Sequence, residues 1–202
     1  VLLCVKPQVI VSVLESLRST VRPNQLFISI VAGWKMGSLQ KYLGPSVALV
    51  RAMPNIAATV GQGATALSFN EYVTSQQRSL ATKIFDSVGI VLPVNEEHLD
   101  AVTGLSGSGP AYIFMVIEAL IDGGVKVGLP RTVAAPLALQ TVLGAVTLLQ
   151  ETKLHPAVLR DQVTTPGGTT IQGIHVLETR GLRSMLMEAV VAATRRSQEL
   201  SG

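Results

Sequence analysis

The sequence predicts an α/β domain with a parallel sheet over residues 1–94, followed by an all-helical domain over residues 95–202. Up to residue 94, short apolar runs alternate with helical patterns, which is typical of βαβ units. After residue 94 no convincing strand pattern follows. The chain is 48% hydrophobic and only 14% charged, against about 25% charged residues in ordinary domains. The helical half is therefore expected to cover apolar surface against another chain.

Five short apolar runs are predicted as strands, the first two buried and the last an edge strand. They are Val1–Val5, Leu26–Val31, Val47–Met53, Ala64–Phe69 and Ile90–Val94. Helices are predicted around Val9–Leu17, Met36–Leu43 and Ser75–Val88. In parallel sheets ligands bind at the carboxyl ends of the strands. The sequence therefore places Lys6-Pro7, Ala32-Gly33 and Pro54-Asn55 together on one edge of the sheet.

The second half is predicted to be helical throughout. We expect a helix over Glu96–Gly104, a small-residue turn over Gly104–Pro110, and a helix capped by Ser108 or Gly109 that stops at Gly123-Gly124. Further helices are expected over Arg131–Glu151, His155–Val163, Thr169–Thr179 and Leu182–Leu200.

The composition argues against several classes of protein. The apolar runs Ala111–Ile121 and Ala134–Leu149 are interrupted and shorter than the roughly 18 residues that a membrane span needs, so we expect an obligate oligomer and no membrane. The net charge of +3 is scattered along the chain, which gives no support for nucleic-acid binding. The lone Cys4 fits a reducing compartment, so a cytoplasmic location is expected and a mitochondrial one is left open. The three histidines are isolated, and no metal site is predicted: they are His98, His155 and His175.

The stretch Asp161–Glu178 carries the strongest chemical signal. It places two glycines and several threonines immediately before a predicted helix. The first amides of a helix are unpaired, and the helix dipole favours negative charge there. With the hydroxyls of Thr165, Thr169 and Thr170, this predicts a seat for a small carboxylate. An ordinary capped turn is the alternative on these residues alone.

A phosphate-binding loop is not convincingly present. The match Gly61-x-Gly63-x-x-Ala66 precedes a predicted strand instead of opening a helix, so we interpret it as a chance match. The chain opens on an apolar strand without Met. We therefore expect the true loop upstream of Val1, and negligible activity from these residues alone.

Three motifs closely resemble the pyrroline-5-carboxylate reductase family. They are Leu105–Ala111, Asp122–Pro130, and Val163–Thr170 followed by His175–Glu178, and the resemblance extends in order along nearly the whole chain. It implies a Rossmann domain followed by a helical dimerisation domain. It also implies the last step of proline biosynthesis, in which NADPH or NADH reduces the cyclic imine to L-proline. The implied assembly is a homodimer with shared active sites, often built further into a decamer.

The resemblance also implies roles for particular residues. The cofactor would be bound by residues of the sheet edge and by one glutamine, which stands where relatives often have asparagine: Val5, Lys6, Pro7, Ala32, Met53 and Gln162. The substrate carboxylate would be held by Thr165 and by the backbone N–H groups of Gly168 and Thr169. Thr170 would hydrogen-bond the ring nitrogen and act as the catalytic residue, chiefly by positioning.

Three alternatives compete with this interpretation. The run Gly104-x-x-Gly107-x-Gly109 also resembles the two-domain hydroxyacid dehydrogenases, but Ile113, Val116 and Ile117 stand where their lysine and asparagine would be, which excludes that reaction. A catalytically silent, truncated paralogue that acts as a dimerisation module stays open. Reduction of other imines, dihydrofolate-like ones included, is set aside because the carboxylate seat suits an amino-acid-like substrate.

Overall fold

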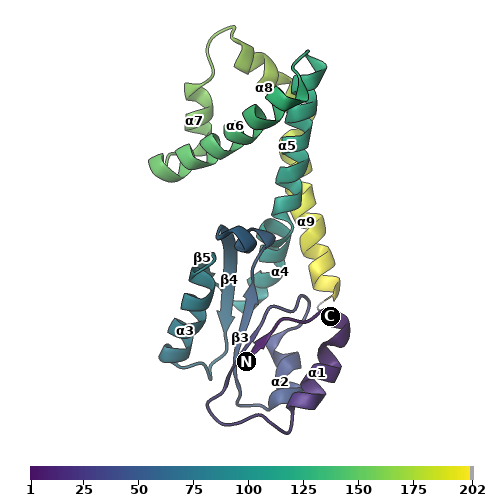
Figure 1. Cartoon of the computed structure of the whole chain (residues 1–202), viewed down its shortest axis with the longest axis vertical. Coiled ribbons are helices and arrows are strands. Elements are labelled where there is room, and N and C mark those ends of the chain that lie inside the picture. Colours follow the sequence, from purple (N-terminus) through teal and green to yellow (C-terminus); the bar gives the residue numbers. More distant parts are fainter. Residues whose placement is uncertain (201–202) are drawn as a thin grey trace. The chain divides into compact units, whose positions relative to one another are not determined.

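The computed structural model describes residues 1–200 and divides into two compact units. The first unit comprises Val1–Pro110 and, among the described residues, 188–200. The second comprises Ala111–Met187. Figure 1 shows the sheet of the first unit and the helices of both. Residues 201–202, which the predicted helical domain includes, lie outside the described part of the chain.

The first unit is built on a five-stranded sheet with the strands in sequential order. These are β1 (Leu2–Leu3), β2 (Leu26–Ser29), β3 (Ala48–Met53), β4 (Gly63–Phe69) and β5 (Gly89–Pro93). The first three strands are parallel, as predicted, and β5 is parallel to β4. However, β4 runs antiparallel to β3, so the predicted parallel arrangement does not hold for this one pair. Only residues 54–62 join these two strands, which is too short for the crossover of about a dozen residues that a parallel pair needs.

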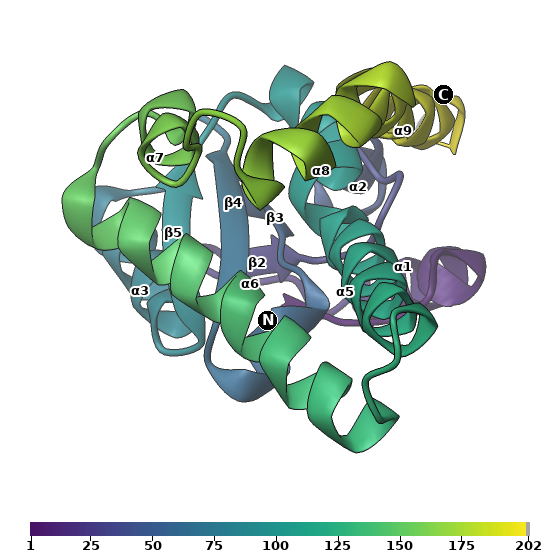
Figure 2. The same cartoon turned by 90° about the horizontal axis from the view of Figure 1, so that it is seen from above.

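Helices cover both faces of this sheet, because its strands bury alternate side chains on opposite sides. Leu49 packs with α1 (Ile10–Leu17) and α2 (Met36–Leu43) on one face. Its neighbour Val50 packs with α3 (Ser75–Asp86) on the other. Figure 2 shows the same arrangement from a second direction. The start of α3 is fixed by a capping box between Thr74 and Gln77.

The helical segment after β5 corrects the predicted turn. A 3₁₀ turn (Glu96–His98), α4 (Leu99–Val102), a π-helical turn (Thr103–Gly107) and α5 (Gly109–Lys126) follow one another, so the chain stays helical through 104–110. The small residues there allow close packing instead of a turn. A Cβ at Gly104 would lie 2.3 Å from the Thr194 hydroxyl oxygen.

The predicted stop of α5 at Gly123-Gly124 was also wrong, because the helix continues to Lys126. A Cβ at Gly124 would lie 3.0 Å from the Cβ of Ala134. Its smallness therefore lets two helices approach each other.

The second unit contains α6 (Arg131–Thr152), α7 (Pro156–Gln162) and α8 (Thr169–Thr179), and α9 (Leu182–Leu200) begins in it. The predicted bounds agree to within a residue or two. Many apolar side chains of these helices are exposed in the single chain, Leu143 by 59% and Met187 by 59% among them. Such surface is typical of a chain that packs against another.

Candidate active site

The predicted cofactor residues of the first unit follow the carboxyl ends of the parallel strands. Leu3 of β1 pairs with Ser29 of β2, which pairs with Arg51 of β3. The segments that follow these strands therefore leave the sheet at one edge. They carry Val5, Lys6, Pro7, Ala32 and Met53, the last being the final residue of β3. Lys6, Pro7 and Ala32 are exposed, whereas Val5 and Met53 are half-buried.

Two backbone turns follow the ends of β1 and β2 at this edge. Pro7 begins a 3₁₀ turn, Pro7–Val9, in which the Val9 N–H donates to the Lys6 carbonyl at 3.1 Å. After Ala32 the chain turns at Gly33, whose φ of 76° is the left-handed conformation that favours glycine. A Cβ at Gly33 would lie 2.8 Å from the Leu200 carbonyl oxygen. The end of α9 is therefore packed directly against this turn.

The predicted carboxylate seat lies in the second unit, between α7 and α8. The Gly168 N–H donates to the Thr165 carbonyl at 3.0 Å, and Gly167 between them has a φ of 67°. With Pro166 at the second position, this is the pattern of a type II turn. A Cβ at Gly168 would lie 2.3 Å from the Thr165 hydroxyl oxygen. Only glycine at position 168 therefore leaves room for the hydroxyl where it lies.

The turn leads directly into α8. Gly168 is the N-cap and has no side chain to bond the first amides of the helix. Within residues 1–200, the hydroxyls of Thr165, Thr169 and Thr170 make no hydrogen bond. By contrast, the hydroxyls of Thr164 and Thr179 each donate to the carbonyl four residues before them, at 2.7 Å and 2.8 Å. The turn thus presents free hydroxyls and free amides together.

Gln162, the remaining predicted cofactor residue, is the last residue of α7 and is exposed. The structure therefore brings the predicted site residues together in two groups, one at the sheet edge and one between α7 and α8. The match Gly61-x-Gly63-x-x-Ala66 lies at the end of a 3₁₀ turn (Ile56–Val60) and the start of β4. It does not open a helix, which agrees with its interpretation as a chance match. In the described part of the chain no His, Cys, Asp or Glu residues group as metal ligands.

Residues 96–200 match the family model described as pyrroline-5-carboxylate reductase dimerisation. A pyrroline-5-carboxylate reductase of Synechocystis sp. is 56% identical over 199 residues, which are 98% of this chain and 74% of the relative. The chain belongs to the pyrroline-5-carboxylate reductase family.

Solved structures of the family agree with this assignment. The Plasmodium falciparum enzyme with NADP bound superposes with a TM-score of 0.94 at 35% identity, over 100% of this chain and 81% of that one. The Coxiella burnetii enzyme gives a TM-score of 0.94 at 42% identity, over 100% and 75%. The predicted fold class, a Rossmann-like sheet followed by a helical dimerisation domain, is thereby confirmed. Because these relatives are named as reductases, the comparisons favour the enzyme over the silent module.

The pyrroline-5-carboxylate reductase family also accounts for the apolar helices. The helical stretches Glu96–Lys126 and Arg131–Thr152 are long and apolar enough to cross a membrane by length and composition alone, and only 6% of each apolar window is buried. The expectation that length excludes a span was therefore wrong, because helices run past the interrupting glycines and prolines. Both stretches fall within the dimerisation match. The match to a dimerisation model confirms that the chain forms an oligomer.

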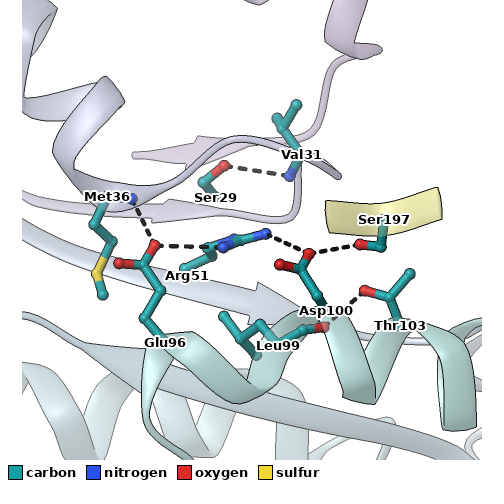
Figure 3. Close-up of polar contacts among 9 residues, drawn as sticks. All are labelled: Ser29, Val31, Met36, Arg51, Glu96, Leu99, Asp100, Thr103 and Ser197. Atoms are coloured by element: carbon teal, nitrogen blue, oxygen red, sulfur yellow. Dashed lines mark hydrogen bonds and ion pairs between the residues drawn. The ribbon is translucent and has the colours of Figure 1, made fainter. Parts of the chain in front are cut away.

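Sequence reasoning missed a polar network around Arg51 of β3 (Figure 3). Arg51 is 5% exposed, and its guanidinium lies 3.4 Å from Glu96 and 4.0 Å from Asp100. The Ser197 hydroxyl of α9 donates to Asp100 at 2.6 Å, and Glu96 accepts the Met36 N–H at the start of α2, also at 2.6 Å. One buried cation thus joins α2, the sheet, α4 and α9. An arginine inside an otherwise apolar strand was the available signal, because such a charge must be paired.

Proposed function

We propose that the full-length gene product that contains this chain reduces pyrroline-5-carboxylate to L-proline, with NADPH or NADH as the hydride donor. The observation that carries the proposal is the turn Thr165–Gly168 at the start of α8. It offers free hydroxyls and unpaired helix amides where glycine keeps the space clear. Such a group suits a small carboxylate, as helix N-termini attract anions.

The sheet edge fits a nicotinamide dinucleotide. It combines small or apolar side chains, Val5, Ala32 and Met53, with the exposed cation of Lys6, so a ring and an anionic group could both lie there. Family membership supports this placement, and the Plasmodium falciparum relative is described with NADP bound. Pro7 and Gln162 complete the proposed cofactor contacts. When bound, the reduced nicotinamide supplies the hydride.

The residues of the turn would bind and orient the substrate. The Thr165 hydroxyl and the Thr169 N–H would hold the carboxylate. The Gly168 N–H donates to the Thr165 carbonyl in the free loop. It would form a bifurcated hydrogen bond to this carbonyl and to the substrate carboxylate. The Thr170 hydroxyl would hydrogen-bond the ring nitrogen, and its oxygen would accept the N–H of the protonated imine. Hydride addition to a C=N bond is easiest when the nitrogen is protonated, so an acceptor oxygen here aligns the imine and favours the charged form. The proton itself would come from water, because a threonine hydroxyl is a weak acid.

We also propose how the chain is divided and assembled. Residues 1–94 would form the end of the dinucleotide-binding domain and residues 95–202 the dimerisation and substrate domain, a division that the family match at 96–200 supports. In a homodimer, the sheet edge of one subunit and the turn of its partner would make each active site. Dimers would assemble further into a decamer, in the cytoplasm.

The test is the oxidation of NADPH by pyrroline-5-carboxylate in the full-length protein. Thr170→Ala should lower kcat/KM by about 10- to 100-fold, the effect of a lost hydrogen bond to a charged group, and Thr170→Ser should retain much of the activity. Thr179→Ala is the matched control, because its hydroxyl points to its own helix at His175. Equal activity in Thr170→Ala and wild type would refute the role of Thr170. A wild-type protein without imine-dependent oxidation would refute the function.

A further inference from the structure

The side chain of Asn55 connects three segments of the first unit. It lies just beyond β3 and is half-buried. Its Nδ2 donates to the Ser106 carbonyl at 3.1 Å, in the π-helical turn Thr103–Gly107. Its Oδ1 accepts the N–H of Ala64 in β4 at 3.2 Å. Both ends of the carboxamide are therefore in use, by partners 51 and 9 residues away.

The Ser106 carbonyl needs a donor because of Pro110. In an α-helix each carbonyl accepts the N–H four residues later, and for Ser106 that residue is Pro110, which has no N–H. The preceding backbone has already changed register, since the Ser108 N–H donates to the Thr103 carbonyl five residues back at 2.9 Å. Pro110 therefore cannot give Ser106 the α-helical bond, and Asn55 supplies a donor from another segment.

A second contact joins the same two segments. A Cβ at Gly107 would lie 2.6 Å from Cε of Met53, so the methionine side chain occupies the space that glycine leaves. Met53 and Asn55 flank Pro54, and both contact the π-helical turn. The end of β3 is thus fixed to this turn by one hydrogen bond and one close apolar contact. Short π-helical turns occur frequently at functional sites.

We propose that Asn55 is a positioning residue for the cofactor, acting through its hydrogen bond to the Ser106 carbonyl. It anchors the segment after β3 to the π-helical turn and so holds Met53 at the sheet edge. The proposal rests on the proposed function, in which Met53 contacts the dinucleotide. Loss of the Asn55 donor then affects the binding of NADPH more than the binding of the imine, whose contacts lie in the second unit.

The donor half of the amide is tested in the full-length protein. Asn55→Ala removes both hydrogen bonds, whereas Asn55→Asp keeps the acceptor for Ala64 and removes only the donor. Both should raise the KM for NADPH about tenfold, as expected when a half-buried carbonyl loses its partner, with the KM for pyrroline-5-carboxylate within about twofold of wild type. An Asn55→Asp enzyme with wild-type KM values would overturn the proposal.

Pro110→Ala provides the second arm, because it returns a backbone N–H four residues after Ser106, where an α-helical bond would need it. Alone, Pro110→Ala should change the KM for NADPH by less than about twofold. Combined with Asn55→Ala, it should lower the KM for NADPH at least about threefold relative to Asn55→Ala, as expected of coupled residues. Independent effects in the double variant would overturn the pairing. If Asn55→Ala does not fold, folding of Asn55→Ala/Pro110→Ala supports the pairing, and failure of both opposes it.

Failure of the proposed function can be told apart from failure of the Asn55 proposal. A wild-type protein that shows no imine reduction would refute the function. Urea unfolding of wild type, Asn55→Ala, Pro110→Ala and the double variant would then still measure the coupling of Asn55 and Pro110.

Discussion

Gly168→Ala is the sharpest perturbation of the proposed carboxylate seat, because the three atoms nearest to the new Cβ all belong to Thr165, its carbonyl oxygen at 3.2 Å among them. The new Cβ would lie 2.3 Å from the Thr165 hydroxyl oxygen, and real contacts of this kind do not fall below 3.0 Å, so the oxygen must move by at least about 0.7 Å. Thr165 is exposed and can rotate away. The backbone of Gly168, with φ −75° and ψ 173°, is a conformation that alanine adopts readily. The variant should therefore fold normally with the hydroxyl misplaced.

The expected magnitude follows from the bond that is lost. A hydrogen bond to a charged group contributes about 1.5–3 kcal/mol, which corresponds to a loss of about 10- to 150-fold in kcat/KM for pyrroline-5-carboxylate. The free energy of unfolding should change by less than about 1 kcal/mol, because alanine in an allowed conformation mainly restricts the unfolded chain.

The assay compares kcat/KM, from NADPH oxidation, in four full-length proteins: wild type, Gly168→Ala, Thr165→Ala and the double variant. If both changes remove the same hydroxyl contact, the double variant should be no worse than the poorer single one. Gly173→Ala is the matched control, since a Cβ at this position of α8 meets nothing within 4 Å. Wild-type activity in Gly168→Ala, or multiplied losses in the double variant, would refute the assigned geometry.

Two further predictions concern stability and assembly. Arg51→Met should destabilise the protein by about 3–5 kcal/mol, because it leaves buried carboxylates without their cation. Ser197→Ala should destabilise it by about 1.5–3 kcal/mol through the lost bond to Asp100. Urea unfolding measures both, and a larger loss of stability in Ser197→Ala than in Arg51→Met would contradict the central place of Arg51. Leu143 in α6 is 59% exposed, and Leu143→Asp should dissociate the oligomer, as measured by analytical ultracentrifugation. Leu80 in α3 is 53% exposed, and Leu80→Asp should leave the oligomer intact. An intact oligomer in Leu143→Asp would place the interface elsewhere.

Where helices and strands lie was predictable from the sequence, because it depends on periodicity and on local signals. The four helices after Pro130 were predicted to within a residue or two, and α3 starts at its capping box. The turn at Thr165–Gly168 was likewise predictable, since Pro166 and Gly167 suit a type II turn locally. Its chemistry as a carboxylate seat stays a prediction.

Glycine-rich stretches were the main source of error in the second half. Glycines at positions 104, 107 and 124 predict a turn or a helix stop, yet all three lie inside helical segments and leave room for a neighbouring chain segment. A sequence does not say whether a missing Cβ serves backbone freedom or close packing, because the neighbour that needs the space is remote along the chain.

By itself, the sequence determined the order of the elements, the family, and the need of the helical half for a partner. The tertiary structure decided the direction of β4, the pairing of Arg51 with Glu96 and Asp100, and the donor that Asn55 gives to Ser106. The physical reason is the range of the interactions. Propensities and caps act over a few residues, whereas a buried charge or an orphaned carbonyl finds its partner only after distant segments have packed together.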